Sequence, residues 1–235
     1  MREYTNLLWP EGPFGADRRP FGKPSQMIAA FTVDWTAQDL PVAAAAVYLR
    51  VKRAGTVEVS TVTMNPGLVA VAPEEQADPL RIVGWLDRGL VRARRHATVL
   101  AGHNLADTLK TARLHVDKPL AGLTGVAASW AARSNKERGT ARMIDTATDL
   151  DNPQAFAQRL SAPLCRVAPA LWPHTAQQQT DAALSCLVRT LAVGLAVAWH
   201  VDAYRWDPSG GPLSVERAVA HAAWDSFSRS AQVAS

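Results

Sequence analysis

The pattern of apolar residues predicts three β-strands in the first third of the chain. Residues 27–35, MIAAFTVDW, are mostly apolar, which is typical of a strand that is buried on both faces. Residues 43–53 and 55–67 have the apolar and β-branched content of two more strands, and a short turn around Ala54-Gly55 separates them. The three segments together predict a three-stranded meander.

The pattern changes to helical spacing after residue 78. Apolar residues recur at intervals of three and four between 79 and 96, which predicts a helix. Segment 180–200 is apolar and too long for a strand, so it predicts a buried helix with Thr180 or Gln179 near its cap. The other predicted elements are a strand at 97–102, helices at 103–114 and 119–133, a strand at 141–145 and an amphipathic C-terminal helix at 214–230.

This order of elements predicts one α/β domain, a mixed sheet flanked by helices, with an extension at each end. The N-terminal arm covers residues 1–26, the central domain 27–200 and the C-terminal helical extension 201–235. Four prolines in the arm argue against regular structure, whereas its leucine, tryptophan and phenylalanine side chains argue against a solvated linker. We expect the arm to pack on its own domain or on another subunit.

The composition is that of a folded chain with a mild excess of basic residues. With 235 residues, of which 48% are hydrophobic and 20% charged, the chain can bury a core. The net charge of +4 suits an anionic partner without requiring one. Cys165 and Cys186 have no zinc-ribbon spacing. The first 26 residues lack the apolar core of a signal peptide, and no apolar run reaches membrane-spanning length, so we expect a cytoplasmic protein with no membrane partner.

Five segments at the ends of predicted strands or the starts of predicted helices carry the candidate chemistry. They are FTVDWTA with Asp34, TMNPG at 63–67, ATVLAGHNLADTLKTARL with His103, Asn104 and Asp107, RMIDT with Asp145 and Thr146, and PHTAQQQTDAALSCLVRTLA with Asp181. In this order they resemble the DEDD (DnaQ-like) family of 3′-to-5′ exonucleases, over residues 27–200. The resemblance implies a ribonuclease-H-like fold and catalysis at Asp34, Asp107 and Asp181.

The first motif departs from the family pattern. Thr36 stands where the family has a second acid, and two-metal phosphodiester hydrolysis uses several carboxylates to hold two divalent ions. Asp34, Asp107 and Asp181 could still bind one magnesium or manganese ion if the metal site is retained, and the sequence makes no cofactor certain. The alternative is that Asp34 and Asp107 are carboxylates that bond backbone N–H groups at a strand end and in a first helical turn.

The third motif also departs from the family. Ala176 or Gln177 stands where the family has a His or Tyr that orients or deprotonates the attacking water. His174 would replace that base if the loop before the helix bulges by two residues, and it is otherwise an ordinary surface histidine in a proline-rich turn.

Several further residues are candidates for substrate binding. Trp35 either stacks a planar substrate at the rim of the site or faces inward beneath the sheet. His103 and Asn104, with Thr36, would brace or line the site. An arginine-rich helix face is either solvated or an anion site, and its candidate residues are Arg81, Arg88 and Arg92.

These features favour an exonuclease-like protein whose metal site is partly dismantled and whose pocket is reused for non-nucleolytic, biosynthetic small-molecule chemistry. Carboxylates that cluster without metal repel one another, so at least one pKa should rise and supply a general base for a cationic or amine-bearing substrate. The alternatives are a metal-dependent exonuclease on DNA or RNA 3′ ends and a non-catalytic binding subunit. The arm and the C-terminal helix favour a protein partner or a homo-oligomer.

Overall fold

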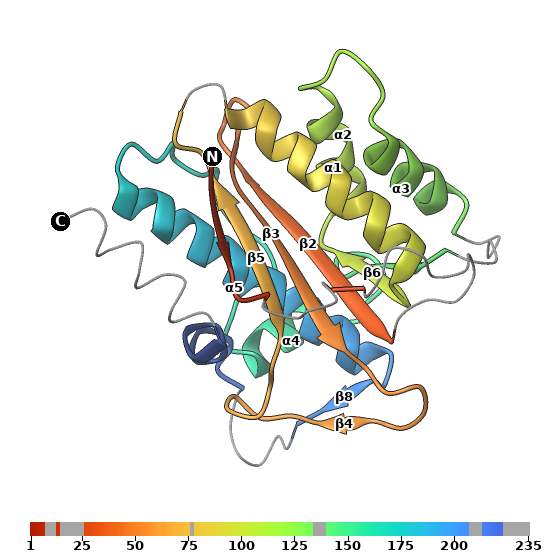
Figure 1. The fold of residues 1–235 in the computed structure, drawn as a ribbon. Helices are drawn as coiled ribbons and strands as arrows, with labels where there is room; N and C mark the ends of the chain where they lie inside the picture. The colour runs from red at the N-terminus through yellow and green to blue at the C-terminus, as the bar shows by residue number, and fades with distance from the viewer. Residues whose placement is uncertain (8–12, 15–25, 76–77, 134–139, 207–212, 223–235) are drawn as a thin grey trace.

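The structure is a computed structural model that describes residues 1–7, 13–14, 26–75, 78–133, 140–206 and 213–222. A six-stranded mixed sheet forms its centre, in the strand order β1-β5-β3-β2-β6-β7 (Figure 1). The strands are β1 (Arg2–Thr5), β2 (Met27–Trp35), β3 (Pro41–Arg50), β5 (Gly67–Ala72), β6 (Val99–Gly102) and β7 (Arg142–Asp145). A separate parallel pair joins β4 (Val57–Glu58) to β8 (Tyr204–Arg205).

The sheet combines an antiparallel half with a parallel half. Strands β1, β5, β3 and β2 pair antiparallel in succession, whereas β6 pairs parallel with β2, and β7 pairs parallel with β6. Parallel strands end at the same edge of a sheet, so the carboxyl ends of β2, β6 and β7 lie side by side. This edge carries most of the residues that the sequence singles out.

Helices cover both faces of the sheet, as Figure 1 shows. On one face lie α1 (Asp78–His96), α2 (Leu105–Arg113) and α3 (Ala121–Ala131), and on the other lie α4 (Pro153–Arg159) and α5 (Ala176–His200). Side chains alternate along β2, so Ala29 and Phe31 belong to the core under α1, whereas Ile28 and Ala30 belong to the core under α5. The predicted α/β architecture, a mixed sheet flanked by helices, is confirmed.

The third strand of the meander is not where the pattern predicted it. Within residues 55–67 the structure has only the two-residue strand β4, and the third strand of the main sheet is β5, which begins at Gly67. The segment before it, STVT at 60–63, is polar, and its hydroxyl groups form a local turn in which Ser60 and Thr63 bond each other. The GLVAVA run of β5 is buried throughout and pairs with β3 instead, between β3 and β1 in the sheet.

The N-cap of helix α5 lies four or five residues before the predicted cap, Gln179 or Thr180. Its N-cap is Thr175, whose side chain accepts from the Gln178 backbone N–H, while the Gln178 side chain accepts from the Thr175 backbone N–H. This reciprocal capping box fixes the start of the helix. Asp181 therefore stands in the second turn of α5 instead of opening it.

The terminal regions join the central fold within the described residues. Arg2–Thr5 forms the edge strand β1 against β5, so the expectation that the whole arm lacks regular structure was wrong. Phe14 is buried against Tyr48 at a centroid distance of 5.4 Å. Residues 215–222 are helical, and Val215, Ala218 and Val219 are buried in the core under α5. Residues 8–12 and 15–25 of the arm, and residues 207–212 and 223–235, lie outside the described residues.

The expectation that no apolar run reaches membrane-spanning length was wrong for helix α5. By length and composition it is apolar enough to cross a bilayer, but 78% of its most apolar window is buried inside the protein. A central core helix of a soluble protein has this property, so the helix gives no reason to place the chain in a membrane.

Candidate functional site

The carboxyl edge of β2, β6 and β7 is the candidate site. Asp34 and Thr36 stand at the end of β2, His103 and Asn104 follow β6, and Asp145 ends β7. In open α/β sheets, ligands bind outside the carboxyl ends of the strands. The side chains at this edge therefore decide what chemistry the fold supports.

Asp34 forms a buried ion pair with Arg189. Its Oδ2 accepts from Arg189 Nη2 on α5, and Arg166 Nη1 lies 3.6 Å from the same oxygen. Arg189 Nη1 also donates to Ser185 Oγ at 2.8 Å, one turn earlier on the helix. Asp34 is 4% exposed and Arg189 5% exposed, so water screens the pair little. Burial raises the pKa of the Asp34 carboxyl, and the charges of Arg189 and Arg166 oppose that rise.

The structure does not bring the three predicted acids into one group. Asp107 is exposed in the first turn of α2, and Asp181 is exposed on α5, where its Oδ1 accepts from Gln177 Nε2 at 2.8 Å. Asp181 precedes Arg189 by eight residues, which is about 12 Å along the helix axis. No group of three His, Cys, Asp or Glu side chains that could hold a metal occurs among the described residues.

The predicted repulsion between clustered carboxylates is therefore not what perturbs Asp34. The cause of its raised pKa is desolvation by burial, and the neighbouring charges are cations that lower the pKa. The donor set also does not fit a divalent ion, because the buried Asp34 carboxylate already contacts two guanidinium groups and the buried Asp145 carboxylate accepts from backbone N–H groups of α2.

Thr36 shapes the turn that follows β2. Its Oγ1 accepts from the backbone N–H groups of Gln38 and Leu40 at 3.2 and 3.1 Å, and its own N–H donates to the Leu40 carbonyl at 2.8 Å. Asp39 adopts a positive φ of 61° within this turn. A short hydroxyl side chain suits such a position because it accepts from nearby backbone N–H groups. Thr36, the position at which the resemblance predicted a departure from a second acid, is thus a turn former.

The His103-Asn104 turn is held by the end of β7. Asn104 has φ 50° and occupies the N-cap position of α2, where the Asp145 carboxylate accepts from the backbone N–H groups of Asn104 and Leu105 at 2.9 and 2.7 Å. His103 Nδ1 lies 2.8 Å from Thr146 Oγ1, and burial lowers the pKa of His103, while the charge of Asp145 partly opposes this. Asp145 was not among the predicted site residues, although the RMIDT segment pointed to it. Its position indicates a structural role at the start of α2.

Trp35 and the candidate arginines of α1 lie on the α1 face of the sheet, opposite the face covered by α5. The Trp35 ring stacks on His115 at 5.8 Å and 8°, and His115 Nε2 bonds the Asp39 carbonyl at 2.6 Å. Arg81, Arg88 and Arg92 are exposed on α1, and Arg81 is paired with Asp78. Because α1 and α5 cover opposite faces, the arginines do not surround the Asp34 side chain.

A cavity of about 550 Å³ opens beside the end of β2. One wall is the turn after β2, and the other is the segment before α5, which is anchored by the Ala170 N–H bond to the Trp35 carbonyl at 2.8 Å. The cavity brings together the predicted residues Thr36 and His174. Its lining residues are Thr36, Ala37, Gln38, Leu40, Pro169, Ala170, Leu171, Trp172 and His174.

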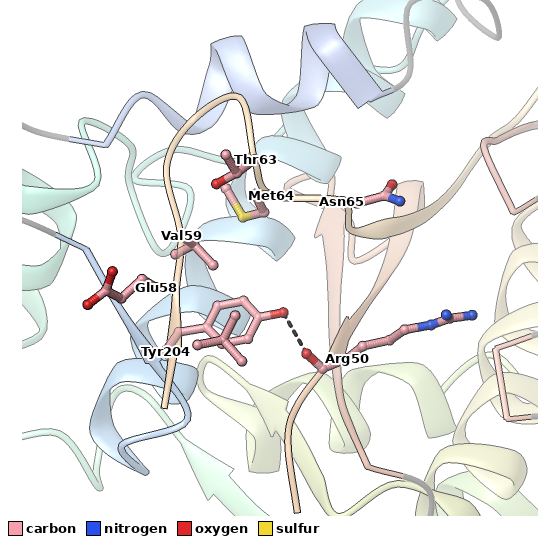
Figure 2. A pocket seen from close by; sticks show the side chains of 8 residues that line it. Arg50, Glu58, Val59, Thr63, Met64, Asn65 and Tyr204 are labelled. Atoms are coloured by element: carbon pink, nitrogen blue, oxygen red, sulfur yellow. Dashed lines mark hydrogen bonds between the residues drawn. The ribbon is translucent and has the colours of Figure 1, made fainter. Parts of the chain in front are cut away.

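A second cavity, of about 180 Å³, lies at the opposite end of the sheet. Figure 2 shows the Tyr204 ring at its centre, with the hydroxyl directed to the Arg50 carbonyl, to which it donates at 2.8 Å. The side chains of Glu58, Arg50 and Asn65 point away from the ring in this view. Burial raises the pKa of Tyr204 to about 12, so the phenol stays protonated and acts as a hydrogen-bond donor that ties β8 to the end of β3.

Comparison of the chain with protein-family models, with curated protein sequences and with solved structures gave no match.

Proposed function

We propose that the chain has a ribonuclease-H-like fold and is a divergent exonuclease-like protein that does not perform two-metal phosphodiester hydrolysis. The element order supports the fold, because the antiparallel strands β2, β3 and β5 are followed by a helix, the parallel strand β6, further helices, the parallel strand β7 and the late helix α5. The position of Asp34 at the carboxyl end of β2 supports the relation to exonucleases.

The Asp34–Arg189 pair carries the proposal that metal chemistry is lost. A hard divalent cation needs carboxylate oxygens, and here the only buried acid at the end of β2 among the described residues is already neutralised. A divalent ion at this point would face two guanidinium charges, Arg189 and Arg166. The internal cation of Arg189 takes over the electrostatic role that a metal has in the family.

The function that the geometry supports best is binding and conversion of an organic small molecule in the cavity beside β2. Its volume of about 550 Å³ is in the range of ligand sites, and its walls combine Leu40, Leu171 and Trp172 with a few polar groups. His174 is in the lining, and histidine is the side chain that most often acts in general acid–base catalysis. The Thr36 hydroxyl accepts hydrogen bonds from two backbone N–H groups, so its own O–H can donate a hydrogen bond to a ligand.

The lining also narrows the class of ligand. No carboxylate is among the described residues that line this cavity, so a cationic or amine-bearing substrate has no counter-charge there. An uncharged ligand with a flat apolar body matches the apolar walls better. This replaces the amine-bearing substrate that the predicted carboxylate cluster favoured.

The loss of metal chemistry is tested with manganese and a 3′-labelled oligonucleotide. We expect calorimetry to detect no manganese binding above that of Asp34→Asn, and the wild-type protein to release no labelled nucleotide. Manganese-dependent release of nucleotide that Asp34→Asn abolishes would overturn this part of the proposal.

The cavity is tested with indole and tryptamine, which share a ring system but differ in charge. We expect indole to bind the wild-type protein more tightly than tryptamine, as measured by saturation-transfer NMR. Leu171→Asp should weaken indole binding, because Leu171 lines the cavity. The fold should tolerate this change, because Leu171 is 87% exposed. Val167→Asp is the matched control, since Val167 is in the same segment, is 98% exposed and is not in the lining. Equal effects of the two substitutions would contradict the assignment.

A further inference from the structure

A groove between α2 and α3 forms a second candidate site, separate from the cavity beside β2. It has a volume of about 310 Å³, near the lower end of the range for ligand sites. Its floor is apolar and comes from both helices, with Leu109 on α2 and Ala127 and Trp130 on α3. Leu114, just after α2, lines it as well and is 70% exposed.

The rim of this groove is cationic. Lys110 and Arg113 line it from the last turn of α2, and both are exposed. Arg133 lies just beyond α3, with its guanidinium carbon 3.7 Å from the centroid of the Trp130 ring. The groove therefore combines an aromatic floor with three positive charges around it.

The aromatic floor is held in place before any ligand binds. Arg133 Nη1 donates to both carboxylate oxygens of Asp149, at 2.9 and 3.0 Å, and Asp149 in turn accepts from the Asp145 backbone N–H at 2.9 Å. Asp145 also accepts from the first N–H groups of α2. The same short segment thus positions both walls of the groove, and a preorganised site loses less entropy on binding.

The charges near the groove favour anions over cations. Asp149 is engaged by Arg133, and Asp107, three residues before Lys110 on α2, is not in the lining. Two lining cations, Lys110 and Arg113, remain to meet a ligand, and no acid is in the lining among the described residues. Charge-assisted hydrogen bonds from such groups to a carboxylate are stronger than neutral ones.

We infer that the α2–α3 groove binds a small amphipathic anion, whose flat apolar body lies on Trp130 and Leu109 and whose carboxylate meets Lys110 and Arg113. Such a ligand satisfies both properties of the groove at once, since the floor takes the apolar body and the rim takes the charge. The site is independent of the cavity beside β2, because the two share no lining residue.

The test uses 2-naphthoate and 2-naphthylmethylammonium, two probes with the same ring system and opposite charge, in titration calorimetry on the full chain. We expect the anion to bind roughly tenfold more tightly than the cation, a difference of about 1.4 kcal/mol that two exposed charge contacts can supply. The double variant Lys110→Gln/Arg113→Gln should remove this preference and leave the far-ultraviolet circular dichroism unchanged, because both side chains are exposed.

Two control variants separate the groove from other surfaces. Arg53→Gln changes an exposed arginine in the turn after β3, and His174→Gln changes the cavity beside β2. Both should leave 2-naphthoate binding unchanged, whereas Trp130→Ala should weaken it. The inference is overturned if the two probes bind equally or if neither binds. It is also overturned if His174→Gln weakens 2-naphthoate binding as much as the Lys110→Gln/Arg113→Gln double variant does.

Discussion

Removal of Arg189 should destabilise the protein because it leaves the Asp34 carboxylate buried without its main partner. Breaking a buried ion pair by removing one member costs about 3–5 kcal/mol. Arg166 stays 3.6 Å from Asp34 and is partly exposed, so we expect Arg189→Met to lose about 3 kcal/mol, at the lower end of this range. For a chain of this size, about 3 kcal/mol corresponds to a fall in Tm of about 6–12 °C.

The second half of the prediction is a double-mutant cycle measured by urea unfolding. Asp34→Asn/Arg189→Met removes both charges, and replacement of a whole buried pair is often neutral. The double variant should therefore lose at least about 2 kcal/mol less than the sum of the two single losses. Asp181→Asn, which changes an exposed acid on the same helix, is the control and should stay within about 0.5 kcal/mol of the wild type. A coupling energy below about 0.5 kcal/mol would refute the reasoning.

The pH dependence of Arg189→Met has a definite sign. Burial already raises the pKa of Asp34, and the substitution removes the charge and the hydrogen bond that oppose this rise. The folded variant then holds a proton that the unfolded chain releases. The contribution of Asp34 to the stability of the variant should therefore be largest at low pH and should be lost as the pH rises through the folded-state pKa of Asp34, so the loss relative to wild type is larger at pH 8 than at pH 5.

Three further predictions concern the framework around the site. Gly122→Ala should cost about 1–3 kcal/mol in urea unfolding, because a Cβ there would lie 2.1 Å from the Asp87 carbonyl oxygen, whereas Gly125→Ala, which meets only a flexible arginine side chain, should cost less. Thr36→Val should cost about 1–2 kcal/mol because two backbone N–H groups lose their acceptor, and Thr36→Ser should restore most of it. Burial lowers the pKa of His103, so the unfolded state gains a proton first as the pH falls below about 6.5 and stability drops there. His103→Gln should show a smaller drop in Tm between pH 7 and pH 5, and an unchanged slope would contradict this role.

The sequence by itself determined the elements whose burial pattern is local. Strand β2 and helix α1 are near the predicted bounds because a continuous apolar run and a three-to-four spacing each fit one regular structure. The start of α2 at the His103-Asn104 turn was also predicted, although its N–H groups are bonded by the distant Asp145 and not by the Asn104 side chain. The start of α5 was within reach as well, since Thr175 and Gln178 have capping-box spacing, but the apolar run that begins later masked it.

Only the tertiary structure decided which side chains meet at the end of β2. Asp34 and Arg189 are 155 residues apart, and their contact depends on how α5 lies across the sheet, which no local pattern encodes. The same packing places Asp181 away from Asp34, and it puts the arginines of α1 on the opposite face. Sequence order predicts which residues reach a sheet edge, but a metal site needs carboxylates within a few ångströms of one another. Here packing placed the Arg189 guanidinium against the Asp34 carboxylate, a contact that no local pattern could predict.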